Sequence, residues 1–531
     1  MRKKVSLVLS FVVVVLIVTL GISFAYFTAQ FTGGETTDTI TVTGGSMNIT
    51  YDGGPNINIA NIIPDNSPAA IKTFTVTGNN TTDIDMNYKI SFVVEYNDFS
   101  EDALKYRLTS TNTDNNGEVA PSILDLTNIG SGAKIIELGI GFFDVPTGGN
   151  KVHTYNLEIY FPNTTYNQNE DQDKEFRSYV RIENYQDPCS SGNCLKDKIL
   201  GKNNENVTIP LTEPGKQVSL SNETVLASAE DDYGTSYYFR GAIKNNFIMF
   251  ADMCWRIVRI TGDGSIKLVL YNYNKGANSC SGIGNSYAFA RYNEATYKSY
   301  FNELENSNAY IGFMYGTAGS ENYENEHTNN NKSTILNNLE TWYLNNLVSY
   351  ENHLADTIWC NDKSVDTKYP YGTILGYGSN RTGYSASGRI YANGLQATNA
   401  TPTLICPNDS NGGKLSSFTV DDINYGNGDL TYKIGLLTAD EIVYAGGMFA
   451  VENSTFYINE NTKDTSWWTL SPYYYTSSNI AFVFLMSPTS GFLNRNLGVK
   501  FNLGLRPAIS LISTTQVSGE GTSTNPYQVE V

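Results

Sequence analysis

Residues 83–96 read DIDMNYKISFVVEY, and apolar and mostly polar side chains alternate here more regularly than elsewhere in the chain. One side of the alternation carries Ile84, Met86, Tyr88, Ile90, Phe92, Val94 and Tyr96. Period-two alternation over this length predicts a strand with one buried and one solvated face. Shorter runs at 73–77, 155–161 and 180–182 repeat the pattern between turns rich in Gly, Asn, Pro and Asp. We therefore expect residues 35–185 to form an all-β sandwich.

The composition changes after this region. The stretch that follows holds a small loop between Cys189 and Cys194, then Pro210 and Pro214-Gly215. Pro and Gly at this density are typical of a linker between domains. The expected divisions are a linker with a small cysteine loop over 186–222, an α+β domain over 223–513 and a polar tail over 514–531.

Local signals for both strands and helices support the α+β expectation. Apolar runs at 255–260 and 266–270 flank Asp-Gly, a pair that favours the positive φ of a hairpin turn. Ser333 can cap a helix whose apolar residues recur at spacings of three and four. Thr438 and Glu441 have the spacing of a capping box that begins a second helix.

The chain begins with Arg2, Lys3 and Lys4, followed by a mainly apolar stretch over 5–27. About 20 such residues in a helix cross the ~30 Å hydrocarbon core of a bilayer. Positive residues before the stretch favour an N-terminus in the cytoplasm. We therefore expect residues 1–30 to be a signal anchor, a membrane-spanning helix that holds an extracytoplasmic protein at the cell surface. The alternative is a signal peptide cleaved near Ala25, which would give a secreted protein.

The formal net charge is −18 at pH 7. An acidic surface repels phosphate groups, which argues against nucleic acid as a partner.

The chain has six cysteines. An even number in an oxidising compartment favours disulfides over metal sites. Spacing favours the pairs Cys189–Cys194, Cys254–Cys280 and Cys360–Cys406, although the sequence leaves other connectivities open. No CxxC motif is present, so we expect neither a zinc site nor a thioredoxin-type redox site.

The N-terminal third carries a family resemblance. Ala25-Tyr26-Phe27-Thr28, the FTVT run at 74–77 and the DIDMNY run at 83–88 resemble the camelysin and TasA group of exported Gram-positive biofilm-matrix proteins. The likeness covers roughly residues 1–185. It implies a β-sandwich, export through a dedicated signal peptidase, and a role in an extracellular matrix or fibre.

A second resemblance covers the C-terminal half. It rests on YFRG at 238–241, CWRIVR at 254–259, LTADE at 437–441, Trp467-Trp468 and Arg506-Pro507. These residues are similar to an uncharacterised module of surface proteins from low-GC Gram-positive gut bacteria. They also look like the C-type-lectin-like fold shared with formylglycine-generating enzymes. No active-site cysteine pair of those enzymes and no calcium-dependent sugar motif of true lectins is matched, so the likeness implies the fold alone.

Catalytic motifs are missing from the sequence. HExxH, GxSxG and P-loop patterns do not occur. The three histidines, His153, His327 and His353, lie in unrelated segments, and we expect them to be exposed polar residues. We therefore expect no catalytic, cofactor-binding or metal-binding residue.

Paired carboxylates leave one enzymatic alternative open. A glycosidase works with two carboxyl groups at a defined separation, and Asp231-Asp232 and Asp440-Glu441 are available. Glu441, however, is explained better as the capping residue of a helix.

The adjacent Trp467 and Trp468 have two interpretations. In an extended segment one of them can face a ligand, stacking on a sugar ring or anchoring a protein partner. Alternatively, both belong to the core of a large domain. Arg506 is expected to form a buried fork to a carboxylate rather than a ligand clamp.

Three functions follow as hypotheses. The first is a non-enzymatic surface protein for adhesion or recognition, which binds a glycan or a protein through its lectin-like C-terminal domain. The second is a secreted, fibre-forming matrix subunit that assembles through an open sheet edge. The third is a cell-wall or glycan-modifying enzyme.

Overall fold

In a computed structural model, the chain divides into two units, Met1–Asp187 and Pro188–Val531. The division falls close to residue 185, where the sandwich is expected to end. The structure describes residues 47–60, 62–80, 86–110, 123–143, 149–164, 168–185, 189, 192–203, 207–208, 224–273, 279–281, 287–292, 295–367, 375–391, 400–407, 414–462, 465–488 and 491–530.

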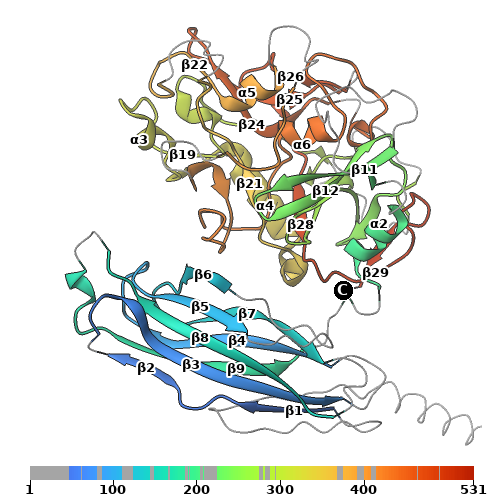
Figure 1. Ribbon diagram of the computed structural model, residues 1–531. Helices are drawn as coiled ribbons and strands as arrows, with labels where there is room; N and C mark the ends of the chain where they lie inside the picture. Colours follow the sequence, from blue (N-terminus) through green and yellow to red (C-terminus); the bar gives the residue numbers. More distant parts are fainter. Residues whose placement is uncertain are drawn as a thin grey trace, which may run out of the picture. The chain divides into compact units, whose positions relative to one another are not determined.

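The first unit contains two antiparallel sheets. The five-stranded sheet has the order β1 (Met47–Asp52), β3 (Asp65–Asn80), β8 (Lys151–Phe161), β5 (Lys105–Ser110) and β6 (Ile123–Asn128). The four-stranded sheet has the order β2 (Ile57–Ala60), β9 (Glu175–Asn184), β4 (Met86–Asn97) and β7 (Lys134–Phe143). A short 3₁₀ turn, η1 (Asn169–Asp171), precedes β9. Phe74 and Leu157 of the first sheet share one buried apolar cluster with Ile90 and Phe92 of the second, so the sheets pack as a sandwich (Figure 1).

Strand β4 forms from residues 86–96 of the alternating stretch, and residues 83–85 lie outside the described residues. Tyr88, Ile90, Phe92 and Val94 are buried, as the alternation predicts. The pairing of β4 with β9 shifts register between Val94 and Tyr96. An extra residue at such a shift turns the following side chains to the other face, and Tyr96 is accordingly 39% exposed.

The second unit is built around two larger sheets. The nine-stranded sheet runs β10 (Val207–Thr208), β11 (Thr224–Asp231), β12 (Gly234–Gly241), β14 (Met253–Ile260), β13 (Phe247–Phe250), β30 (Tyr527–Val529) and β29 (Val517–Ser518), and β15 (Ile266–Asn272) joins β14 to β28 (Ala508–Leu511). The six-stranded sheet runs β18 (Lys298–Ser299), β27 (Leu503–Gly504), β24 (Trp467–Tyr475), β25 (Ala481–Met486) and β26 (Leu493–Asn494), and β22 (Thr382–Gly383) pairs with β24. Three strand pairs complete the described set: β16 (Arg291–Tyr292) with β17 (Ala295–Thr296), β19 (Met314–Tyr315) with β20 (Asn331–Lys332), and β21 (Trp359–Cys360) with β23 (Ser417–Phe418).

The helices of this unit are short. They are α2 (Leu195–Asn203), α3 (Tyr323–His327), α4 (Thr334–Asn346), α5 (Ser385–Ile390) and α6 (Ala439–Tyr444), with 3₁₀ turns η2 (Asn308–Ile311), η3 (Val348–His353), η4 (Lys414–Ser416) and η5 (Tyr457–Asn459). Helix α4 begins where the sequence predicts, because the Ser333 hydroxyl accepts a hydrogen bond from the Leu336 amide at 3.3 Å. Its apolar face, which includes Leu339 and Tyr343, is buried.

The expected fold class needs correction. The structure is mostly β-sheet, and the C-terminal unit is dominated by strands rather than balanced between helices and strands. Among the described residues, no helix is long and apolar enough to cross a membrane. The longest of them, α4, has 13 residues. Residues 1–30, expected to form a membrane-spanning helix, lie outside the described residues.

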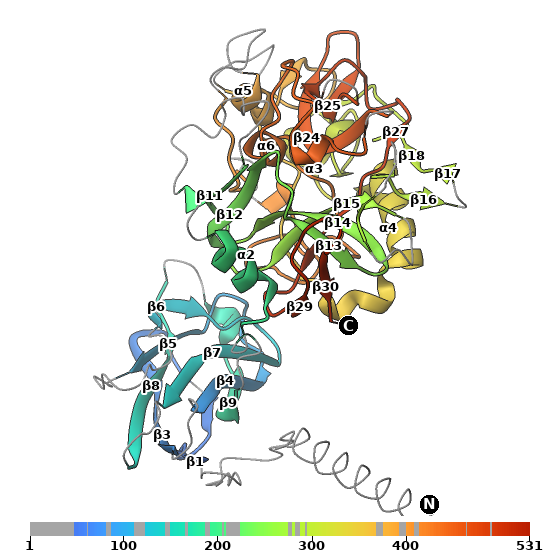
Figure 2. The same cartoon turned by 90° about the vertical axis from the view of Figure 1, so that its right-hand side faces the viewer.

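The expected linker and tail are also partly wrong. Within 186–222, α2 buries Leu195 and Ile199 in the core of the second unit. Within 514–531, β30 pairs with β13, and Figure 2 shows these strands side by side. Val517 and Tyr527, both 1% exposed, are single apolar residues in a polar sequence, which is why the pattern missed them.

The three disulfides of the structure are Cys189–Cys194, Cys254–Cys280 and Cys360–Cys406, the pairs that the spacing favours. All three lie in the second unit.

A buried charge cluster as the candidate functional site

A group of charged side chains lies inside the second unit, where β14, β15 and α6 meet. Arg259 of β14 and Lys267 of β15 are directly opposite each other in antiparallel strands. Both are buried, with 6% and 2% of their surface exposed. Two like charges this close repel each other, so their burial requires neighbouring carboxylates that compensate the positive charge.

Glu441 of α6 supplies the main compensating charge. Its Oε1 accepts hydrogen bonds from Arg259 Nε at 3.1 Å and from Lys267 Nζ at 2.8 Å. Its Oε2 accepts the Thr438 amide at 3.0 Å and completes the predicted capping box. One carboxylate therefore begins the helix and neutralises two cations.

The electrostatics of Glu441 reflect this position. Burial raises the pKa of its carboxyl, but Lys267 and Arg259 outweigh burial and lower the pKa to about 2. Burial in turn lowers the pKa of Lys267, and Glu441 offsets part of that shift. Glu441 is thus ionised at any physiological pH.

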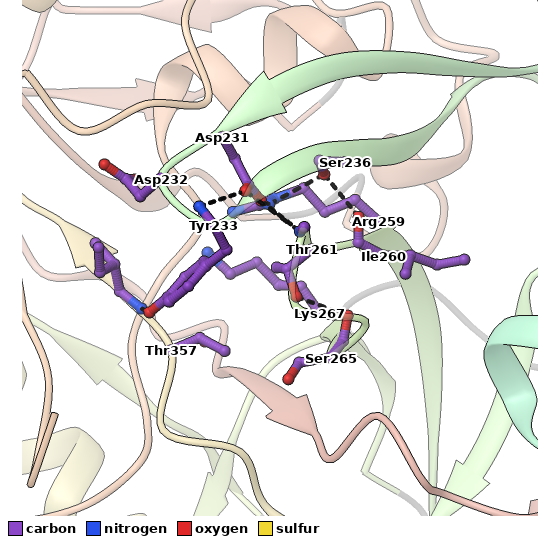
Figure 3. Close-up of polar contacts among 12 residues, drawn as sticks. Asp231, Asp232, Tyr233, Ser236, Arg259, Ile260, Thr261, Ser265, Lys267 and Thr357 are labelled. Carbon is purple, nitrogen blue, oxygen red and sulfur yellow. Dashed lines mark hydrogen bonds and ion pairs between the residues drawn. The ribbon is translucent and has the colours of Figure 1, made fainter. Parts of the chain in front are cut away.

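Asp231, at the end of β11, supplies a second carboxylate. Figure 3 shows its side chain directed at Arg259 and at the turn that begins at Thr261. Asp231 forms an ion pair with Arg259 Nη1 and accepts the Gly262 amide at 3.2 Å. The same Arg259 nitrogen also donates to the Ser236 hydroxyl at 3.2 Å.

A second ion pair lies beside the first. Arg389 of α5 donates from Nε and Nη2 to the two carboxylate oxygens of Asp440, both at 3.0 Å. It also donates from Nη1 to Asp362 at 2.8 Å. Paired parallel hydrogen bonds of this kind are among the stronger ionic contacts in proteins.

A cavity of about 20 Å³ is lined by members of both ion pairs. Lys267, Arg389 and Glu441 line it together with Cys360 of a disulfide. This volume is large enough for a water molecule and too small to enclose a sugar ring.

Two further groups at the cavity are engaged with the backbone. The Asp232 carboxylate accepts the Cys406 amide at 3.0 Å, and burial raises the pKa of this carboxyl. The Tyr233 hydroxyl accepts the Ile358 amide at 3.0 Å, and burial raises the pKa of the phenol. Of the carboxylates considered for a glycosidase, Asp232, Asp440 and Glu441 line this cavity, and each is hydrogen-bonded to a cation or to the backbone.

The residues of the C-terminal resemblance converge on these elements. Arg240 donates to the carbonyls of Val443 and Tyr444 at 3.2 Å, at the end of α6. A cation is stabilising at the C-terminal end of a helix because the last carbonyl groups have no partner within the helix. Arg240, Arg259 and Glu441 thus hold α6 against the large sheet.

Trp467 and Trp468 are not at the surface. Both are completely buried in β24, and the Trp468 indole donates to the Ser299 carbonyl at 2.9 Å. The core interpretation holds because successive residues of a strand in a layered unit can both be covered.

Arg506 also differs from expectation. Its guanidinium donates to the backbone carbonyls of Leu270 at 3.1 Å and Ile458 at 2.7 Å, rather than to a carboxylate. It lies over the Trp467 ring at 4.8 Å.

The histidines were expected to be exposed, but two are buried and His353 is half-buried. His153 is 1% exposed inside the sandwich, where it stacks on Phe143, and His327 is completely buried. Burial, with a contribution from Lys363, lowers the pKa of His327 to about 3. His327 therefore stays neutral, so burial carries no charge penalty for that ring.

Sequence reasoning missed Lys267, Asp362 and Arg389 as members of the cluster. Their only signal is charge inside apolar or irregular segments, such as Lys267 within the apolar run at 266–270.

No family model matches the chain, and no curated protein matches its sequence.

Proposed function

We propose that the protein is a non-enzymatic extracytoplasmic protein with a recognition or structural role. The observation that carries the proposal is the saturation of the charge cluster. Glu441 and Asp231 are paired with buried cations, Asp440 is paired with the partly buried Arg389, and the cavity that the cluster lines has room for about one water molecule. A glycosidase needs two carboxyl groups that contact a substrate, whereas these carboxyl groups contact cationic side chains of the protein itself.

The disulfides support the extracytoplasmic part of the proposal. Stable disulfides are rare in reducing compartments and common in exported proteins. The second unit carries three of them.

The test compares binding with turnover on the full chain. Purified protein is screened against cell-wall and host glycans and extracellular proteins, and each glycan is also assayed for released product. We expect no product with any glycan, and we expect whatever binding is found to persist in Asp232→Asn. Turnover that disappears in Asp232→Asn, and persists in the control Asp263→Asn outside the cavity, would overturn the proposal.

The alternative structural role, a matrix subunit, has support in the first unit. β7 is an edge strand of 10 residues, whereas β2 at the opposite edge of the same sheet has four. The sequence of β7 is largely apolar, and its Ile135 is 59% exposed. A long apolar edge offers unpaired backbone groups to a strand of another chain.

Assembly is tested by placing a charge on that edge. Ile135→Lys should shift any oligomers or fibres seen by sedimentation and electron microscopy towards monomer. The matched control is Val152→Lys, because Val152 is 51% exposed but lies on the interior strand β8. Equal assembly of wild type and Ile135→Lys would remove β7 from consideration.

A further inference from the structure

An amine and a carboxamide lie in contact near the end of α3. Lys363 Nζ donates to Asn329 Oδ1 at 2.6 Å and to the His327 carbonyl at 3.0 Å. Asn329 lies just beyond α3, and Lys363 follows β21. The two residues are 34 positions apart in sequence and are brought together by the fold.

The surroundings of Lys363 hold its amine away from water. The residue is completely buried, and Nζ lies 5.1 Å from the centre of the Phe418 ring. Removal from water favours the neutral form of an amine, which is the nucleophilic form. The adjacent His327 is neutral, because burial above all, and then the positive charge of Lys363, lower its pKa to about 3. Lys363 must therefore lose a proton before it can act as a nucleophile.

An acid contacts the other end of the carboxamide. Asn329 Nδ2 donates to Asp429 Oδ2 at 2.8 Å and to the Leu415 carbonyl at 3.3 Å. These contacts fix the amide plane while its oxygen faces the amine. Two reacting groups that are already held in contact do not have to meet in solution. The entropy lost in such a meeting is a large part of the barrier to the reaction.

We propose that Lys363 and Asn329 form an intramolecular amide bond. Lys363 first loses a proton, which the departing ammonia takes up as ammonium. The neutral amine then attacks the side-chain carbonyl carbon of Asn329, the Nζ–Cγ bond forms, and the Cγ–Nδ2 bond breaks. The amine loses one proton, Nδ2 gains one, and the former amide nitrogen leaves as ammonia. Asp429, hydrogen-bonded to Nδ2, relays that proton. The step consumes no oxidant or cofactor.

The bond would tie the segment after α3 to the segment after β21 and enclose α4 in a covalent loop. Cys360, which forms a disulfide with Cys406, lies three residues before Lys363. The inference concerns these residues alone and does not depend on the proposed function.

Peptide mapping of the full chain tests the bond. After reduction, alkylation and trypsin digestion, the proposal predicts one species that joins 299–332 to 333–368. Its mass is that of the two peptides less one ammonia, because the linked Lys363 no longer permits cleavage. Free 299–332 together with free 333–363, from protein whose three disulfides were intact before reduction, would overturn the proposal.

Variants separate the bond from a simple hydrogen bond. Lys363→Arg keeps the positive charge but lacks the amine, so the two peptides should be recovered entirely unlinked. Asp429→Asn should lower the linked fraction several-fold, while Asp421→Asn, a control on the same segment, should leave it unchanged. Full linkage in Asp429→Asn would overturn the role of Asp429 as the proton relay.

Discussion

The two units use their charged residues differently. In the sandwich, the ion pairs Lys89–Glu137 and Arg107–Glu158 lie at or near the surface. In the second unit, Lys267 and Glu441 form an ion pair with 2% and 4% of their side chains exposed. An exposed pair contributes little to stability, whereas a buried carboxylate is needed once its cations are buried.

The difference shows two ways to hold a β-rich unit together. The sandwich core is apolar, and its alternating strands decide which side chains enter it. The second unit has many short strands and long connections, and it adds three disulfides and a network of buried ions to its apolar core. We expect changes at these added contacts to affect the second unit alone.

Glu441→Gln should have the largest effect. It leaves Lys267 buried without its carboxylate, and removing one partner of a buried pair costs about 3–5 kcal/mol. The measurement is urea unfolding followed by tryptophan fluorescence. All five tryptophans, at 255, 342, 359, 467 and 468, belong to the second unit, so the signal reports that unit alone. A loss below about 1 kcal/mol would mean that the cluster is hydrated.

Replacing both Cys360 and Cys406 with Ser should come next. This disulfide joins residues 46 positions apart, and a loop of this size predicts a loss of about 2–4 kcal/mol in unfolding free energy. The control replaces Cys189 and Cys194, which are five positions apart and constrain the unfolded chain less. Equal losses in the two double variants would contradict the loop argument.

Acid should destabilise the second unit through Glu441. Burial alone raises its pKa, but Lys267 and Arg259 lower the folded-state pKa to about 2, below the ordinary 4.5. Its contribution to stability is therefore complete above pH 4.5 and disappears as the pH falls towards 2. Linkage gives roughly 3 kcal/mol for a shift of this size. The difference in stability between wild type and Glu441→Gln should shrink over that interval, and a constant difference would contradict the assignment.

Glu137→Gln should have the smallest effect. Glu137 and its partner Lys89 are both partly exposed to solvent. The unfolding free energy of the sandwich should therefore change by about 0–1 kcal/mol. Unfolding of the first unit can be followed by circular dichroism after subtraction of the tryptophan-reported transition. A loss comparable to that of Glu441→Gln would remove the contrast between the units.

The sequence predicts those parts of the fold that rest on local patterns. The alternation predicts β4 because successive residues of a strand face opposite sides, and only the register shift before Tyr96 breaks this rule. The capping residues Ser333 and Thr438 predict the starts of α4 and α6 because their hydrogen bonds join neighbours in the chain.

Long-range partners were beyond such patterns. Arg389 and Asp440 lie 51 positions apart, and no local signal connects them. Arg506 was expected to meet a carboxylate, but the fold places the carbonyls of Leu270 and Ile458 around it. Short strands such as β30 are formed by pairing with β13 rather than by their own pattern.

The central claim is that the buried charges of the second unit stabilise the fold and do not bind a substrate. A high-resolution crystal structure of the full chain, soaked with cell-wall and host glycan fragments, tests it most directly. The account predicts one water between the Glu441 and Arg389 ion pairs, with both pairs unchanged by soaking. A glycan fragment in contact with Asp232, Arg389 or Glu441 would contradict it.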